Sequence, residues 1–306
     1  MIIETLRSKE DELPLELAII EPVGPPVGMI QLFHGMAEHK ERYYEFMDYL
    51  ALHGFICAIH DHRGHGSSVH DFSHLGYFYT EDISALVEDA YQVTDYLVTR
   101  YPGLNLTIFS HSMGTLVARS YLKKYDDKID QIIMSGPPTK NNIVKPALAL
   151  AKFLKPFYGK YNPNRLLNRL ALEPYNKGYE EKNSWISSDS QEVTKYNADP
   201  QSGFIFTTNG FINLFKLLKA AQQTNDWHPK HKDLPILLMA GEEDPVIQSV
   251  DKLNELAQSL EIVGYHNISI KLYENKRHEL LNEKDNHIIF EDVLTFLKST
   301  RPVSNE

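Results

Sequence analysis

Short apolar runs rich in β-branched residues alternate with longer amphipathic stretches along most of this 306-residue chain. A strand followed by a helix and then by another strand is typical of a parallel sheet with helices on both faces. The order therefore predicts an α/β fold with a mostly parallel, eight-stranded sheet. The expected strands fall within residues 2–6, 15–20, 27–35, 54–60, 105–114, 128–138, 234–246 and 268–274.

Turn and helix signals divide these runs. The segment SKEDELP separates the first two and predicts an antiparallel hairpin at the start. The clearest helix is expected over residues 80–101, where apolar side chains recur every three to four positions, and Pro102 and Gly103 end it. Further helices are expected over residues 43–53, 115–125, 250–262 and 288–297.

The alternation lapses between residues 137 and 223, where prolines occur at positions 146, 156, 163, 174 and 200. A block without its own strong core pattern indicates an insertion rather than a second independent domain. We therefore expect one core domain formed by residues 1–136 and 224–306, and a helical cap formed by residues 137–223.

The composition excludes several classes of protein. Hydrophobic residues make up 42% and charged residues 24%, as in ordinary globular proteins. The net charge of −10 argues against nucleic acid as the main partner, because phosphate binding needs a positive face. The single cysteine, Cys57, cannot form an internal disulfide, and its apolar surroundings GFICAIH indicate a buried hydrophobe rather than a nucleophile.

Targeting signals are expected to be absent. Acidic residues occupy the N-terminal positions where a secretory signal would need a basic start and an apolar stretch. The sequence contains no uncharged apolar window of about 18 residues, the length that a transmembrane helix requires. These features predict a cytoplasmic protein.

A serine lies in a turn between an apolar strand and an apolar helix, in the sequence Ser110-His-Ser112-Met-Gly114. In this context a nucleophile elbow lifts the Ser112 hydroxyl off the carboxyl edge of the sheet. The usual pattern is Gly-x-Ser-x-Gly, and here serine replaces the first glycine. The position requires a small side chain, which serine still provides.

A serine nucleophile needs a histidine base and an acid that orients the base. After Ser112, one expected strand ends at Glu242-Glu243-Asp244-Pro245 and the next ends near His278. Serine, acid and histidine thus follow the ends of strands in the chain order of a hydrolase triad. Asp244 is preferred to the two glutamates because Pro245 fixes the turn after it.

An oxyanion hole needs two backbone N–H groups near the nucleophile. The Met113 N–H directly follows Ser112 at the expected helix start. The Met36 N–H lies in the polar loop HGMAEH that follows the third expected strand. These two groups are the predicted oxyanion donors.

Five segments, HGMAEHKERY, DHRGHGSS, SHSMGT, AGEEDPV and RHELLNE, resemble the monoacylglycerol lipase and lysophospholipase branch of the α/β-hydrolase superfamily, which has serine aminopeptidase relatives. The resemblance spans nearly the whole chain and agrees with the triad residue by residue. It implies a cap inserted after the sixth strand, and a carboxylester hydrolase that needs no cofactor and acts on small acyl esters or lipids.

The predicted cap begins with a short basic amphipathic helix, KPALALAKFLK. Its apolar side chains are Ala147, Leu148, Leu150, Ala151 and Leu154. We expect some of these to line the acyl site and select Leu148, Ala151 and Leu154 as candidates, with His34 and Gly35 as further substrate contacts beside the oxyanion loop. Residues 137–172 carry seven basic and no acidic side chains. This segment is therefore either an ordinary cap packed on the core or a peripheral contact with lipid surfaces.

Three alternatives remain open. The densest histidine cluster could hold a metal ion instead of forming an ordinary loop; it comprises His60, His62, His65, His70 and His74. The triad could hydrolyse the N-terminal amide of a peptide, in which case carboxylates should gather to bind the substrate ammonium; the candidates are Glu38, Glu173, Glu180 and Glu181. The fold could also serve as a catalytically weak ligand-binding protein.

Overall fold

A computed structural model describes residues 1–225 and 227–299. Its eight strands form one sheet in the order β1-β2-β4-β3-β5-β6-β7-β8. All neighbouring strands are parallel except the pairs β1–β2 and β2–β4, so the predicted mostly parallel sheet is confirmed. The strands are β1 (Ile2–Arg7), β2 (Pro14–Ile20), β3 (Gly28–Phe33), β4 (Phe55–His60), β5 (Leu106–His111), β6 (Gln131–Ser135), β7 (Ile236–Gly241) and β8 (Ile268–Tyr273).

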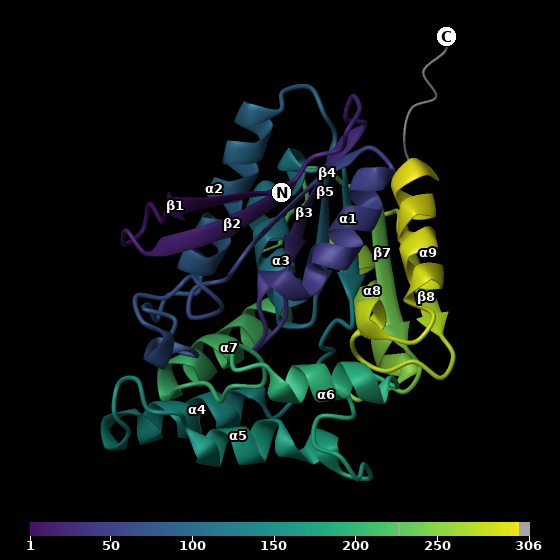
Figure 1. Cartoon of the computed structure of the whole chain (residues 1–306). Helices are drawn as coiled ribbons and strands as arrows, with labels where there is room; N and C mark the ends of the chain where they lie inside the picture. Colours follow the sequence, from purple (N-terminus) through teal and green to yellow (C-terminus); the bar gives the residue numbers. More distant parts are fainter. Residues whose placement is uncertain (226, 300–306) are drawn as a thin grey trace.

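Helices cover both faces of this sheet (Figure 1). Helices α1 (Tyr44–Leu52) and α9 (Asn286–Ser299) pack on one face, and α2 (Ser84–Arg100), α3 (Met113–Tyr125) and α8 (Val250–Val263) pack on the other. Successive residues of a strand alternate between the two cores: in β4, Ile56 and Ala58 face one while Cys57 and Ile59 face the other. Cys57 is fully buried, and burial raises the pKa of its thiol, so it behaves as a core hydrophobe.

Helix α2 begins four residues later than the sequence predicts. The Thr80 hydroxyl accepts a hydrogen bond from the Asp82 N–H, and the Asp82 carboxylate accepts one from the Ser84 N–H. Such local bonds from side chains to backbone compete with helical conformation. The acidic residues before Ser84 therefore form a turn, and the helix begins at Ser84 itself.

The chain between β6 and β7 contains four α-helices and, within the described residues, adds no strand to the sheet. The helices are α4 (Val144–Leu154), α5 (Arg165–Ala171), α6 (Ser190–Ala198) and α7 (Thr208–Ala221). Helix α7 packs on α3 and on α4, and the four helices gather at one end of the sheet (Figure 1). The described residues also contain short 3-10 helices: η1 (Lys40–Tyr43), η2 (Phe72–His74), η3 (Asp126–Lys128), η4 (Lys155–Phe157), η5 (Glu173–Asn176) and η6 (Leu280–Asn282).

Within the described residues, no helix is both long enough and apolar enough to cross a membrane.

Candidate active site

Ser112 occupies a strained turn between β5 and α3. Its backbone has φ 48° and ψ −117°, a conformation that non-glycine residues rarely adopt. The Ser112 N–H donates a 2.9 Å hydrogen bond to the Ser135 carbonyl at the end of β6, which holds the turn against the sheet. Strained backbone of this kind is retained where surrounding structure fixes it, as at functional sites.

The two small residues that flank Ser112 have different reasons for their size. A Cβ atom at Gly114 would lie 2.3 Å from the Phe33 carbonyl oxygen, so only glycine lets α3 approach β3 this closely. Ser110, in place of the usual first glycine, is fully buried, and its hydroxyl donates a 2.9 Å hydrogen bond to the Ile133 carbonyl. The replacement is therefore accommodated in this fold without an unpaired polar group.

The loops after β7 and β8 bring an aspartate and a histidine to Ser112. His278 Nε2 lies 2.8 Å from Ser112 Oγ, and His278 Nδ1 lies 2.9 Å from Asp244 Oδ2. The other Asp244 oxygen accepts a 2.8 Å hydrogen bond from the Val246 N–H. Asp244 is 3% exposed, whereas Glu242 and Glu243 are exposed to solvent. A hydroxyl, an imidazole and a carboxylate in this chain of contacts have the geometry of a Ser-His-Asp triad.

Opposing effects set the pKa of His278. Its burial lowers the pKa, but the charge of Asp244 and its hydrogen bond, together with the charges of Glu279 and Glu38, raise it by more. The imidazole pKa therefore lies above its ordinary value. This environment stabilises the imidazolium form, which a base forms when it takes a proton.

The two predicted oxyanion donors both border a cavity that reaches Ser112. Met36 and Met113 line it beside Ser112 and His278. Within the described residues, neither the Met36 N–H nor the Met113 N–H has a hydrogen-bond partner. Gly35 approaches Ser112 so closely that a Cβ atom added at Gly35 would lie 3.2 Å from Ser112 Cβ.

The cavity has a volume of about 390 Å³, which is in the range of small-molecule sites. One part of its lining is apolar and comes mostly from the 137–223 segment; it includes Val144, Ala147, Leu150, Leu167, Leu170, Leu214, Phe215 and Leu218. The other part is polar or aromatic and includes Glu38, His111, Tyr175, Asn176, Lys182, Trp185, Tyr196 and Glu279. The wall therefore offers both apolar and polar side chains to a bound molecule.

The predicted substrate contacts need correction. The cavity lining includes neither the α4 residues Leu148, Ala151 and Leu154 nor the loop residues His34 and Gly35. Helix α4 is apolar on two sides: Leu148 and Ala151 pack into the core, and the neighbouring side, with Val144, Ala147 and Leu150, faces the cavity.

His34 has a structural position instead. Its Nε2 accepts a 2.9 Å hydrogen bond from the His62 N–H, and its Nδ1 donates a 2.8 Å bond to the Gly35 carbonyl. These bonds join the loop after β3 to the loop after β4. Gly35 lets the loop approach Ser112 closely, and it does not line the cavity.

The histidines considered as metal ligands pack against other aromatic side chains. His62 lies 4.4 Å from His34 and 5.0 Å from His60 between ring centroids, and all of these side chains are buried. His70 and His74 instead contact Tyr79, and His74 stacks on Tyr161. The described part of the chain has no group of three or more histidine, cysteine, aspartate or glutamate side chains placed to hold a metal ion.

Several residues beside the triad were not singled out by their sequence pattern. Glu279 directly follows His278 and is bonded to Arg42, and the Trp185 and His278 rings lie 5.2 Å apart between centroids. Glu38, considered in the sequence only as a ligand for a substrate ammonium, is paired with Arg42. A single sequence does not distinguish buried and paired charges in loops from solvated ones. Glu38, Arg42 and Glu279 do, however, all lie within the segments that carry the family resemblance.

The fold, the strained serine turn and the triad geometry define an α/β-hydrolase. Residues 24–285 match the model of the protein family described as serine aminopeptidase, S33, and the chain belongs to this family. The predicted kinship with monoacylglycerol lipases is thereby confirmed at the level of the family, as is the expectation of a hydrolase enzyme.

Individual relatives agree with this assignment. A monoacylglycerol lipase of Mycolicibacterium smegmatis is 26% identical and aligns with 91% of this chain and 90% of its own length. The human monoglyceride lipase is 28% identical, over 86% of this chain and 79% of its own length. The structure of a thermostable carboxyl esterase from Bacillus coagulans in complex with glycerol has a TM-score of 0.86 at 24% identity, with 98% of each chain covered.

The raised pKa of His278 predicts the acid limb of the activity profile. If His278 is the base, kcat/KM should rise with pH through a midpoint above 6.5, the ordinary histidine value, because the base must be unprotonated. The profile is measured with a neutral ester between pH 5 and 9. A midpoint below 6.5 would show that burial outweighs the neighbouring carboxylates.

The buried histidines predict acid sensitivity of the fold. Burial lowers the pKa of His60 and His65 to about 4, and that of His34 and His62 well below its ordinary value. The unfolded chain therefore binds more protons below about pH 6.5, and the free energy of unfolding falls as the pH decreases. His60 and His65 should each contribute a loss of about 2 kcal/mol by pH 5, and His34 and His62 should act in the same direction.

Urea unfolding at pH 7.5 and at pH 5 measures this dependence. His60→Phe should flatten it, because phenylalanine takes up no proton. Within the described residues, neither ring nitrogen of His60 has a hydrogen-bond partner that this change would remove. The same change at the exposed His266 is the control and should leave the slope unaltered. Equal slopes in His60→Phe and the unaltered protein would contradict this account.

Proposed function

We propose that the chain is a serine carboxylester hydrolase that acts on monoacylglycerol-like or lysophospholipid-like esters, or on short acyl esters. The observation that carries the proposal is the contact chain Ser112–His278–Asp244, whose serine and histidine line a cavity with both apolar and polar side chains in its wall. The curated relatives named monoacylglycerol and monoglyceride lipases support the same substrate class.

In the proposed reaction, Ser112 Oγ attacks the ester carbonyl carbon while His278 Nε2 takes the hydroxyl proton. Asp244 accepts the hydrogen bond from His278 Nδ1, which fixes the tautomer and stabilises the imidazolium. The N–H groups of Met36 and Met113 donate to the oxyanion. The C–O bond to the leaving alcohol then breaks, His278 protonates the alcohol, and water cleaves the acyl-enzyme by the reverse proton path. The proposal requires no cofactor.

The 137–223 segment is proposed as a cap that selects the substrate, on a core of residues 1–136 and 224–306. Its apolar side chains at the cavity, such as Val144, Leu150 and Leu214, would enclose the acyl chain. The polar part near Trp185 and Tyr196 would receive the alcohol. Burial of a flexible acyl chain in this apolar part supplies binding energy of about 0.8 kcal/mol per methylene group.

The cavity matches peptide substrates with an N-terminal amide less well than it matches esters. An α-ammonium needs carboxylates that are free to bind it, but Arg42 occupies Glu38 and the Asn197 side chain donates to Glu181. Glu173 borders the cavity, and Glu180 and Glu181 do not. The candidate carboxylates are thus not gathered into one site, which favours the ester over the amide.

The Ser112→Ala variant tests the nucleophile. Turnover of p-nitrophenyl esters should fall by on the order of 10⁵ to 10⁶-fold in kcat, because the hydroxyl that forms the acyl-enzyme is gone. Covalent labelling by a fluorophosphonate, in which Ser112 Oγ displaces fluoride, should disappear as well. Ser120→Ala on the same helix is the matched control, since its hydroxyl bonds the Leu116 carbonyl.

Three results would contradict the assignment. Retained ester turnover in Ser112→Ala would exclude Ser112 as the nucleophile. Equal loss in Ser120→Ala would indicate damage to α3 instead. Faster cleavage of aminoacyl anilides than of esters by the unaltered protein would favour the amide reaction.

We further propose that the first part of the cap contacts an anionic lipid surface. Ile143, Phe153, Phe157 and Leu170 are each more than half exposed, and Ile143 and Leu170 also border the cavity. Residues 137–172 carry a net charge of +7; their basic side chains are Lys140, Lys145, Lys152, Lys155, Lys160, Arg165 and Arg169. Exposed apolar side chains among basic ones fit an interface with anionic headgroups.

Vesicle binding tests this surface. The double variant Phe153→Ser/Phe157→Ser should bind phosphatidylcholine vesicles containing phosphatidylglycerol at least tenfold more weakly, because it loses two side chains that insert among acyl chains. The control Leu52→Ser/Ile262→Ser removes two apolar residues of α1 and α8 that are even more exposed. Binding that is the same for both double variants, or indifferent to phosphatidylglycerol and to salt, would contradict the proposal.

A further inference from the structure

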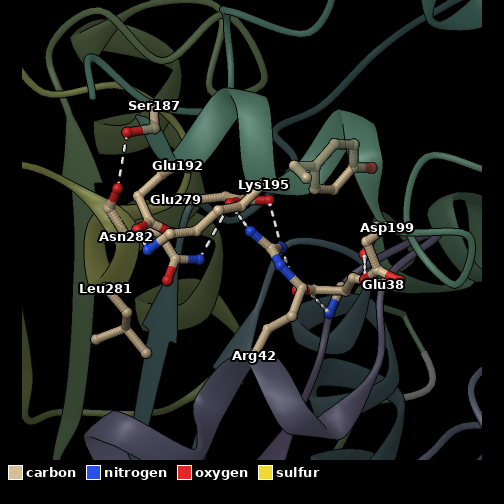
Figure 2. A network of polar contacts seen from close by, with 12 residues as sticks. Glu38, Arg42, Ser187, Glu192, Lys195, Asp199, Glu279, Leu281 and Asn282 are labelled. Atoms are coloured by element: carbon tan, nitrogen blue, oxygen red, sulfur yellow. Dashed lines mark hydrogen bonds and ion pairs between the residues drawn. The ribbon is translucent and has the colours of Figure 1, made fainter. Parts of the chain in front are cut away.

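An arginine whose side chain is 11% exposed joins two buried carboxylates beside the triad. Arg42 Nη1 donates to Glu38 Oε2 at 2.8 Å and to Glu279 Oε1 at 2.9 Å, and Arg42 Nη2 donates to Glu279 Oε2 at 2.6 Å. Figure 2 shows the guanidinium between Glu38 and Glu279. Glu38 is 2% exposed and Glu279 is 6% exposed, so water does not screen these contacts. The guanidinium also lies 4.9 Å from the centre of the Tyr196 ring.

Glu38 holds the loop that carries one oxyanion donor. Its Oε1 accepts hydrogen bonds from the Gly35 N–H at 2.5 Å and from the Tyr43 hydroxyl at 2.9 Å. On the other side of Met36, the Ala37 carbonyl accepts a 2.8 Å bond from the Gly203 N–H. The backbone is therefore fixed on both sides of Met36, while no described residue accepts a hydrogen bond from the Met36 N–H.

Glu279 holds the loop that carries the base. It directly follows His278, and its own N–H donates a 2.7 Å hydrogen bond to the Ile186 carbonyl. Its carboxylate receives both arms of the Arg42 fork and a 3.1 Å bond from the Asn282 amide. Through Arg42, the backbone around Met36 and the backbone around His278 are fixed relative to each other.

Stability does not explain why such charges are buried. Two carboxylates and one guanidinium leave a net charge of −1 in a desolvated place, and apolar residues of the same volume often stabilise a fold as well. Burial raises the pKa of Glu38, helped by the charge of Glu279, whereas Arg42 outweighs burial and lowers the pKa of Glu279. Retention of this arrangement beside the triad indicates a role in the geometry of the reaction.

We propose that Glu38 is a positioning residue that holds the Met36 N–H in register with Ser112 and His278, through its bond to the Gly35 N–H and its link to Glu279 by Arg42. The inference rests on the proposed ester hydrolysis at Ser112. Glu38 acts through the backbone and does not itself touch the reacting atoms. The oxyanion forms only during the reaction, so loss of this residue lowers the rate more than it weakens substrate binding.

Kinetics of Glu38→Ala and Glu38→Gln with p-nitrophenyl butyrate test the inference. Glu38→Ala should lose about 10²- to 10³-fold in kcat, the effect of one misplaced oxyanion donor, with KM changed less than threefold. Glu38→Gln keeps an oxygen that can accept from the Gly35 N–H, so it should recover at least tenfold in kcat over Glu38→Ala. If Glu38→Ala does not fold, Glu38→Asp takes its place, because the shorter acid cannot reach both Gly35 and Arg42.

A trifluoromethyl ketone with an alkyl chain gives a second readout. Ser112 Oγ adds to its carbonyl, the proton passes to His278, and the resulting oxyanion remains in the hole. The inhibitor should bind Glu38→Ala more weakly by about the factor lost in kcat, whereas a purely structural role would not link these two quantities. Asp89→Asn is the matched control, since Asp89 is a buried carboxylate paired with Arg63 and does not border the cavity.

The outcomes are distinct. If the unaltered protein does not turn over the ester, the proposed function fails, whatever Glu38 does. If it does turn over the ester, the inference is overturned by any of three results: kcat within twofold in Glu38→Ala or Glu38→Asp, loss of kcat without loss of inhibitor affinity, or an equal loss in Asp89→Asn. Loss of kcat and inhibitor affinity together, with recovery in Glu38→Gln, supports it.

Discussion

The close approach of α3 to β3 is the constraint on which the site depends. Gly114 lies against the Phe33 carbonyl, with no room for a Cβ atom, so α3 begins directly beside the strand that leads into the Met36 loop. The chain can enter the helix from β5 only through a sharp turn, and Ser112 adopts a positive φ to make it. This one contact therefore places the Ser112 hydroxyl, the Met113 N–H and the backbone before Met36 within a single small volume. An N–H at the first turn of a helix is also favourably oriented toward negative charge.

The histidine side of the site depends on the 137–223 segment. The Arg277 side chain donates to the Ser184 and Ser187 carbonyls at 2.7 and 2.9 Å, and the Ser187 hydroxyl donates to the Asn282 carbonyl at 2.7 Å. The Trp185 ring lies against the His278 ring. Residues 184–188 are thus part of the framework that orients His278, although they lie far from it in sequence. A triad read from strand ends alone gives the order of the three residues but omits this support.

Sequence reasoning reached as far as local periodicity and chain order extend. Alternating apolar runs located the strands because one strand and its flanking turns contain the whole signal, and acid and histidine at consecutive strand ends must meet at one edge of a parallel sheet. It could not reach Arg42, because the partner Glu279 is more than two hundred positions away and the pairing exists only after the sheet has formed. On α4, the sequence favoured Leu148 and Ala151 as substrate contacts. Amphipathicity shows that one side of a helix is apolar, but it does not show whether that side faces a cavity or packs on α7.

The framework also restricts how the cavity can open. The Met36 loop is tied to the α6 region by the bond between Gly203 and Ala37 and by the 2.7 Å pair of His39 with Asp199, and the His278 loop is tied to residues 184–188. Moving that part of the segment outward would release His278 and the Met36 loop together. Ile143, directly before α4, and Leu170 in α5 are at once exposed and in contact with the cavity, and neither takes part in these bonds. The same side chains carry the proposed lipid contact, so a lipid surface would meet the protein beside the cavity at side chains that do not hold His278 or the Met36 loop.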